Sequence, residues 1–217
     1  TFCKRYLMLG LVLSPARFSK LKIYDWDSEK EVAPATALDD VDVVIHLAGE
    51  NVGAGRWTEE TKRRILSSRE LGTRNLVEGL NRLKKPPAFI SASAIGIYGD
   101  GGDTVLTENS PKGTGFLADV CAVWEAEALR AKASRLVIPR FGVVLGEGGG
   151  ALSKLLPVFR AGFGGRVGDG TQWMAWIHRD DVVGFLIHAI STPKIEGIYN
   201  IVAPEPARNS EFAHTLG

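Results

Sequence analysis

The stretch VDVVIHLAGEN, residues 41–51, places a short apolar run directly before a turn of small residues. Valine and isoleucine fill the run, which is typical of a buried strand. Ala48 and Gly49 in the turn leave room for a ligand to approach the backbone. In open α/β sheets, ligands bind at the carboxyl ends of the strands. The stretch therefore predicts a sheet strand that ends at a binding edge.

Similar apolar runs alternate with amphipathic segments along the rest of the chain. Strands are predicted at residues 88–91, 136–138 and 198–202, and long helices at 58–81 and 116–132. Thr58 is the expected N-cap of the first of these helices. Strands that alternate with helices predict an α/β fold with a Rossmann-like, doubly wound parallel sheet. Three loops follow strands and are candidate binding loops, at residues 46–51, 91–94 and 139–142.

The composition excludes some classes of function. Of 217 residues, 26 are Lys or Arg and 25 are Asp or Glu, so the net charge is +1. This balance offers no basic excess for nucleic acid or an anionic membrane surface, and we expect neither as a partner. Two cysteines, Cys3 and Cys121, cannot build a network of disulfides. A reducing compartment, the cytoplasm, is the simplest expectation.

The first residues allow two interpretations. Lys4 and Arg5 precede an apolar run at residues 6–13, which is much shorter than the roughly 20 residues of a membrane span. The charge order fits a short signal peptide, although Gly10 interrupts the run and no A-x-A cleavage site follows. The alternative is that this segment belongs to the core of the fold.

A glycine-rich segment, Gly146 to Ala151, matches the pattern G-x-G-x-x-A and precedes a helix-like segment. The pattern occurs in loops that bind dinucleotide phosphates. We expect no strand after this helix, and no acidic residue lies at a strand end about 20 residues further on, as that motif requires. The segment is therefore interpreted as a loop at the edge of a substrate pocket.

Four segments in sequence order carry a family resemblance: VIHLAGENVGAGRWTEETKRRILSSRELGTRNLVEGL, SASAIGIYGD, PRFGVVLGEGGGALSKLLPVFRAGFGGRVGDGTQWMAWIHRDDVV and IYNIVAPEPARNSEFAHTL. Over roughly residues 40–217, the chain resembles extended short-chain dehydrogenases/reductases of the epimerase/dehydratase superfamily. It is most similar to the "epimerase family protein" branch, of the 39U type.

The resemblance implies a dinucleotide-binding domain at residues 1–145, whose first strand and glycine loop are absent from the given chain. Residues 146–217 would form a small, truncated substrate lobe and the last sheet strand. In this alignment the first residues look like the end of the first helix and the second strand, which favours the core interpretation over a signal peptide.

The resemblance also implies a dinucleotide cofactor. NADP is favoured over NAD, because Ser14 and Arg17 follow the second strand, where they would contact a 2′-phosphate, and no acid precedes Asp25. Pro15 stands where the family often has Arg, which weakens this preference. The expected cofactor-binding residues are Ser14, Arg17, Leu47, Ala48, Gly49, Arg64, Arg69, Ser91 and Val144. For the arginines the alternative is a solvated surface position.

The family's catalytic set is incomplete in this chain. Ser93 matches the family Ser/Thr that hydrogen-bonds a substrate oxygen. The family's Tyr-x-x-x-Lys pair is replaced by Leu117 and Cys121, which cannot exchange protons in the same way. Tyr98 is the candidate to substitute as a catalytic residue. The expected substrate-binding residues are Glu50, Asn51, Trp173 and His178, and no metal site is expected.

Together these features predict an NADP-dependent oxidoreductase or epimerase-like protein that acts on an unknown small molecule. The alternative is a nucleotide-binding sensor or interaction protein without turnover, because the proton-transfer pair is degenerate. A scaffold that binds no nucleotide is a third, weaker hypothesis. By analogy with extended family members, a homodimer through the two long helices is expected.

Overall fold

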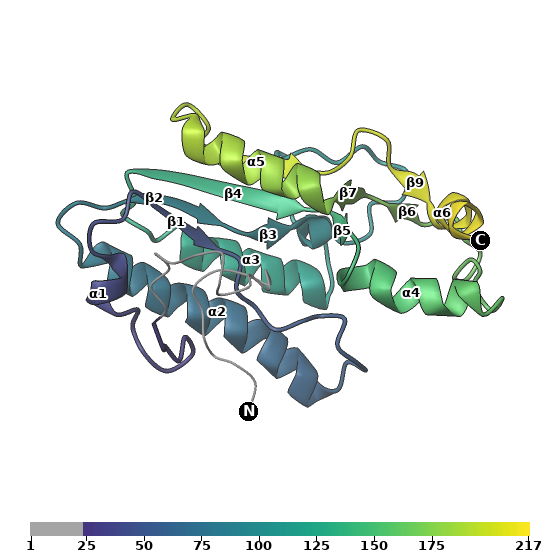
Figure 1. The fold of residues 1–217 in the computed structure, drawn as a ribbon, viewed down its shortest axis with the longest axis horizontal. Helices are drawn as coiled ribbons and strands as arrows, with labels where there is room; N and C mark the ends of the chain where they lie inside the picture. Colours follow the sequence, from purple (N-terminus) through teal and green to yellow (C-terminus); the bar gives the residue numbers. More distant parts are fainter. Residues whose placement is uncertain (1–23) are drawn as a thin grey trace. The chain divides into compact units, whose positions relative to one another are not determined.

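The computed structural model describes residues 24–217 of the chain (Figure 1). These residues divide into two compact units. The first unit contains the residues up to Ala92 together with Asp119–Ile138, and the second contains Ser93–Ala118 together with Pro139–Gly217. The division at residue 145 expected from the family resemblance stays a prediction.

The first unit is a parallel sheet with helices. Strand β1 (Val43–His46) pairs in parallel with β2 (Ala88–Ser91), which pairs in parallel with the first part of β4 (Arg135–Phe141). Helices α2 (Glu59–Asn81) and α3 (Phe116–Ala128) lie beside each other on one side of these strands, and α1 (Ala35–Leu38) precedes β1 (Figure 1). The expected α/β class with a parallel sheet is confirmed.

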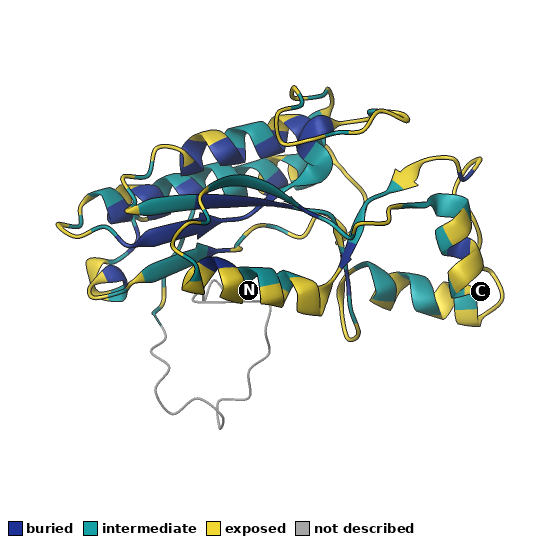
Figure 2. Ribbon diagram, turned by 90° about the horizontal axis from the view of Figure 1, so that it is seen from above, coloured by how far each residue is buried: buried dark blue, intermediate teal, exposed yellow. Residues whose placement is uncertain are grey.

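Helix α2 begins where its sequence predicts. The Thr58 hydroxyl accepts a hydrogen bond from the Thr61 N–H, and acidic residues occupy the first turn, where the helix dipole favours negative charge. Apolar residues at helical spacing then bury one face of α2 against the sheet. Large buried side chains in this core are Ile65, Leu80, Phe89, Ile90, Val120, Val137 and Ile138. Figure 2 shows the same burial along the central strands.

The second unit contains shorter strands. In it, β3 (Ser93–Ala94) pairs in parallel with the last residues of β4, and β8 (Gly197–Ile201) also pairs with β4. Strand β5 (Val143–Leu145) pairs in parallel with β7 (Trp176–His178), and β6 (Trp173–Met174) pairs antiparallel to β9 (Ala207–Arg208). The helical elements are η2 (Ile95–Tyr98, a 3₁₀ helix), α4 (Gly150–Arg160), α5 (Arg179–Ser191) and α6 (Asn209–Leu216).

The expectation that no strand follows the glycine-rich segment and its helix is wrong. Strand β7 follows α4 and pairs in parallel with β5, so the glycine-rich segment joins a strand to a helix within a β–α–β unit. Gly148 and Gly150 in this loop have positive φ angles of 79° and 66°, which favour glycine. Three residues are too few for sequence periodicity to identify β7 as a strand.

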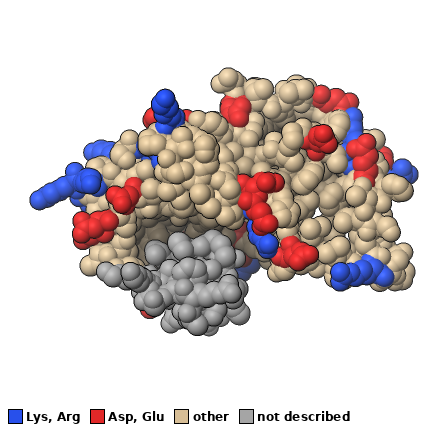
Figure 3. Space-filling model, turned by 45° about the horizontal axis from the view of Figure 1, so that its top comes forward, with Lys and Arg blue, Asp and Glu red and all other residues tan. Residues whose placement is uncertain are grey.

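The other boundaries differ from expectation by a few residues. Helix α3 ends at Ala128, four residues before the expected end, and β4 extends to Phe141, beyond the expected Ile138. In the described part of the chain, no helix combines the length and the apolar character needed to cross a membrane. On the face shown in Figure 3, acidic and basic side chains are interspersed.

Candidate functional site

The carboxyl ends of β1 and β2 lie side by side in the first unit. His46 is in register with Ser91, and the Ala92 N–H donates to the His46 carbonyl at 2.9 Å. The loop that leaves β1 exposes Leu47 and Gly49, while Ala48 is half-buried. The turn of small residues predicted from the sequence therefore lies at the edge where parallel sheets bind ligands.

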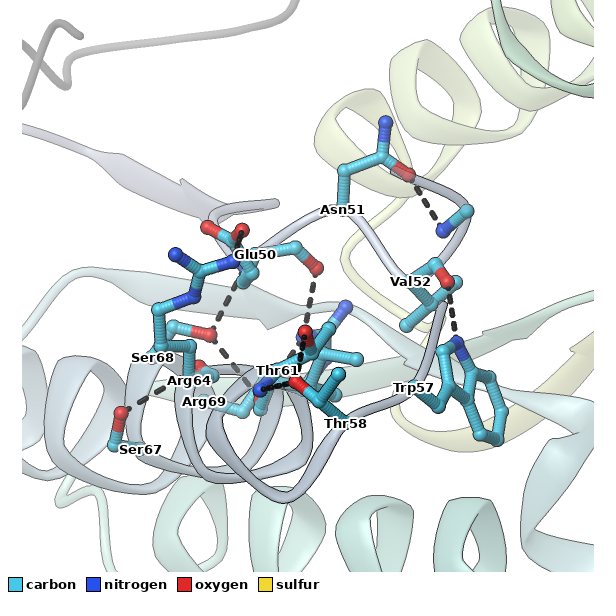
Figure 4. A network of polar contacts seen from close by, with 12 residues as sticks. Glu50, Asn51, Val52, Trp57, Thr58, Thr61, Arg64, Ser67, Ser68 and Arg69 are labelled. Atoms are coloured by element: carbon cyan, nitrogen blue, oxygen red, sulfur yellow. Dashed lines mark hydrogen bonds and ion pairs between the residues drawn. The ribbon is translucent and has the colours of Figure 1, made fainter. Parts of the chain in front are cut away.

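Helix α2 fixes this loop through two adjacent side chains (Figure 4). The Ser68 hydroxyl accepts from the Glu50 N–H at 2.9 Å, and Arg69 Nη1 donates to the Glu50 carbonyl at 3.0 Å. Arg69 Nη1 also donates to the carbonyl of Ile65, one turn earlier in α2, at 3.1 Å. The segment SSR is thus the part of the helix that shapes the loop LAGEN.

Asn51 and Trp57 stabilise the rest of the loop. Asn51 Oδ1 accepts from the Gly53 N–H at 2.8 Å, and Trp57 Nε1 donates to the Val52 carbonyl at 2.8 Å. The carboxylate of Glu50 lies 3.6 Å from Arg64 Nη2 in an exposed ion pair. Such pairs contribute little to stability, so Arg64 and the Glu50 carboxylate remain available to a polar ligand.

The guanidinium of Arg69 is partly buried between several groups. Its Cζ lies 5.0 Å from the centroid of the Trp124 ring, within range of a cation–π interaction. A Cβ on Gly49 would come within 3.0 Å of Arg69 Cζ, so glycine at position 49 is what permits this approach. Burial lowers the pKa of Arg69, while Cys121 and Glu50 act in the opposite direction. Arginine nevertheless keeps its charge at neutral pH.

His46, the last residue of β1, is buried at this edge and was not among the expected site residues. Its Nε2 lies 2.9 Å from the Thr73 hydroxyl, and its ring stacks on Phe89 and meets the edge of Trp124. Burial, with a smaller contribution from Arg69, lowers the pKa of His46 to about 4. The imidazole is therefore neutral at physiological pH. The sequence offered one signal for His46, because a histidine at the end of an apolar strand is a polar residue at the expected binding edge.

Two buried polar atoms have no hydrogen-bond partner in the described part of the chain: Ser91 Oγ and Trp124 Nε1. Ser91 was expected to bind cofactor from the sequence, whereas Trp124 was not among the expected site residues. Cys121, which stands in the place of the family lysine, is buried in the same helix. Leu117 is half-buried at its start.

In the second unit, Ser93 and Tyr98 are both buried. The Tyr98 hydroxyl donates to Asn200 Oδ1 at 2.7 Å and accepts from Arg140 Nη1 at 2.8 Å. The Asn200 N–H in turn donates to a Glu108 carboxylate oxygen at 2.7 Å. This network fixes the phenol in place, as expected of a structural tyrosine, and a catalytic role for Tyr98 stays a prediction.

The remaining candidates of this unit lie on short strands. Trp173 donates from Nε1 to Asp103 Oδ1 at 2.8 Å, and the Arg208 guanidinium lies 3.9 Å from the centroid of its ring. His178 caps α5, since its Nδ1 accepts from the Asp180 N–H at 3.2 Å. Val144 is in β5, paired with Ile177. Their contacts with cofactor or substrate stay predictions.

Ser14 and Arg17, on which the preference for NADP depends, lie outside the described residues. Within residues 24–217, no group of three or more His, Cys, Asp or Glu side chains is arranged to hold a metal ion.

Comparisons with known proteins identify relatives of the whole described region. The model of the "NAD dependent epimerase/dehydratase family" matches residues 9–202. A chloroplast epimerase family protein of Arabidopsis thaliana, an SDR39U1 homologue, is 41% identical over 178 residues, which cover 80% of this chain and 51% of the relative. An epimerase family protein of Mycobacterium leprae is 37% identical over 215 residues, covering 98% of this chain and 69% of the relative.

A solved structure is similar as well. The human epimerase family protein SDR39U1, crystallised with NADPH, is 37% identical, with a TM-score of 0.78 over 82% of this chain and 62% of that one. The chain thus spans about half to two-thirds of the length of these relatives. The family match, the identities and the shared fold agree with the resemblance found in the sequence. The chain belongs to the NAD-dependent epimerase/dehydratase family, in the branch of the SDR39U1-type epimerase family proteins.

Proposed function

We propose that the protein binds NADP(H) at the carboxyl edge of β1 and β2, with NAD(H) as the weaker ligand. The observation that carries this proposal is the loop Leu47–Gly49 at the strand ends, where Ser68 and Arg69 fix the backbone of the next residue, Glu50. Small residues at such an edge allow a dinucleotide to approach the backbone. The human relative was crystallised with NADPH, which supports the same ligand here.

The residues proposed to contact the cofactor differ in what they offer. Ala48 and Gly49 offer a close backbone surface, and Arg64 and Arg69 offer positive charge for phosphate or hydroxyl oxygens. Ser91 offers a buried hydroxyl that lacks a partner in the described part of the chain. Val144 offers an apolar contact. Ser14 and Arg17 are retained as the groups that would distinguish NADP from NAD.

We further propose that the protein is an oxidoreductase or epimerase-like enzyme acting on a small molecule. The bound cofactor would supply hydride transfer. The Ser93 hydroxyl would hydrogen-bond a substrate oxygen, and Tyr98 is retained as the proton donor to be tested. Glu50, Asn51, Trp173 and His178 would bind the substrate through polar and ring contacts.

The replacement of the catalytic pair favours a second candidate function. Leu117 and Cys121 cannot carry out the proton transfer of a Tyr–Lys pair. A protein that binds NADPH without oxidising it would act as a sensor or interaction module.

Thermal unfolding of the full-length protein with NADPH, NADH or neither tests cofactor binding. A ligand at 100 times its Kd should stabilise the fold by about 2.7 kcal/mol, which raises Tm by several degrees. A larger shift with NADPH than with NADH supports the proposal. No shift with either nucleotide contradicts both candidate functions. Oxidation of NADPH with a panel of carbonyl compounds then separates the enzyme from the sensor.

A further inference from the structure

Arg69 has donors that the protein itself does not use. Nη1 makes both of its hydrogen bonds, to the carbonyls of Glu50 and Ile65, whereas Nε and Nη2 make none within the described part of the chain. A partly buried cation with unused donors loses hydration without full compensation. A bound ligand that brings oxygen acceptors would provide the missing hydrogen bonds.

The surroundings of Arg69 are rich in donors. Trp124, which packs against the guanidinium, has an indole N–H without a partner, and the hydroxyl of Ser91 at the end of β2 is also without one, in the described residues. His46 brings no charge, because burial keeps its imidazole neutral. The carboxylate of Glu50, which acts on the pKa of Arg69, forms its ion pair with Arg64 rather than with Arg69. This edge of the first unit therefore suits a ligand that presents hydroxyl or phosphate oxygens.

The positive charge of this edge comes from α2. Residue 121 of α3 is a buried cysteine and brings no cation, and it lies within electrostatic reach of Arg69. Trp124, one turn later in α3, contacts the guanidinium directly. Gly49 has no side chain and so leaves the space that the guanidinium occupies. Contacts from α3 and from the loop after β1 therefore hold the guanidinium of Arg69, on α2, beside position 121.

On the assumption that the proposed nucleotide site is correct, we propose that Arg69 is its principal cation, supplied from α2 in place of a charged residue at position 121. Trp124 is the surface that positions it. Because a guanidinium does not release its proton at neutral pH, this arrangement binds oxygen atoms but relays no proton. Nucleotide binding is thereby separated from proton transfer in this chain.

The test is calorimetric titration of the full-length protein with NADPH. Arg69→Met should weaken binding by about tenfold or more, since one charge-assisted contact is lost, while Arg69→Lys should stay within about threefold of wild type. Adding Cys121→Lys to Arg69→Met should recover most of the lost affinity. The matched control is Arg63→Met, an exposed arginine on the same helix that pairs with Glu60; its affinity should not change.

The dependence of Kd on salt separates a charge contact from a structural role. If Arg69 binds the nucleotide, the affinity of Arg69→Met should fall less steeply with ionic strength than that of wild type. Binding by Arg69→Met within about twofold of wild type would overturn the inference. So would weakened binding with an unchanged salt dependence, which would mean that Arg69 only shapes the loop. If Arg69→Met/Cys121→Lys does not fold, Arg69→Lys and the salt dependence decide. Wild-type protein that binds no NADPH would refute the proposed function itself, and this inference with it.

Discussion

His46 couples the stability of the first unit to pH. Its folded pKa of about 4 lies below the ordinary value of 6.5, mainly because of burial, so the unfolded chain binds this proton more tightly. The stabilisation is complete above pH 6.5 and is lost as pH falls toward 4. One pKa unit corresponds to about 1.4 kcal/mol, so the loss should reach roughly 3 kcal/mol. We expect the urea midpoint to fall between pH 6.5 and 4.5, and to fall less in His46→Gln. Equal slopes in both proteins would contradict this assignment.

Gly49 controls the position of Arg69. A Cβ at this residue would lie 3.0 Å from Arg69 Cζ, so Gly49→Ala must displace the guanidinium. Because the guanidinium ends a flexible side chain, we expect unfolding free energy to change by less than about 1 kcal/mol. NADPH affinity should fall by about tenfold. Gly55→Ala in the same loop is the matched control, because nothing lies within 4 Å of its added Cβ. Equal affinities of the two variants would show that the Gly49–Arg69 contact is not used in binding.

Helices α2 and α3 are joined by an ion cluster around one buried carboxylate, that of Glu127. Arg74 of α2 donates from Nε and Nη2 to Glu127 Oε1 at 3.0 and 2.7 Å, and Arg130 donates to Glu127 Oε2 at 2.6 Å. Burial would raise the pKa of Glu127, but the hydrogen bonds from Arg74 and Arg130 outweigh it and lower the pKa. The packing of α2 against α3 therefore includes a Glu127 carboxylate that Arg74 and Arg130 keep ionised.

Removing Arg74 should show how much the ion cluster around Glu127 contributes to stability. Arg74→Ala leaves the buried carboxylate short of donors and should cost about 1–3 kcal/mol of unfolding free energy. Arg82→Ala removes an exposed arginine that pairs with Glu78 on the same helix, and should cost less than about 1 kcal/mol. Urea denaturation of both variants at pH 7 measures the difference. A cost for Arg74→Ala no larger than for Arg82→Ala would show that the cluster does not stabilise the helix pair.

At the scale of the whole molecule, the question is whether the protein turns over its nucleotide. The variant Leu117→Tyr/Cys121→Lys restores a Tyr–Lys pair one helical turn apart in α3. In an Arg69→Met background, the new lysine would not compete with a second cation nearby. We expect this triple variant to oxidise NADPH with a carbonyl panel faster than wild type. The Arg69→Met single variant is the control. A triple variant that binds NADPH without any gain in oxidation would show that more than the pair is missing.

Much of the fold of the first unit could be predicted from the sequence. The alternation of β1, α2, β2, α3 and β4 was predicted because burial periodicity and an N-cap such as Thr58 are local properties of the chain. The loop after β1 was predicted to be a binding edge because parallel strands end together. The family followed from motifs that lie in the same order along the chain.

Tertiary structure decided the chemistry of that edge. The contact of Arg69 with Gly49 and Trp124, the burial that keeps His46 neutral, and the unpaired Ser91 hydroxyl all join residues far apart in sequence. The pairing of β7 with β5 could likewise not be predicted, because a strand of three residues is too short to show a periodicity of its own. Local patterns specify which face of an element is buried, but charge and hydrogen bonding at a site depend on which elements pack together. The sequence alone therefore determined the fold and predicted the edge of the sheet proposed to bind the nucleotide, and packing decided where the positive charge of that edge lies.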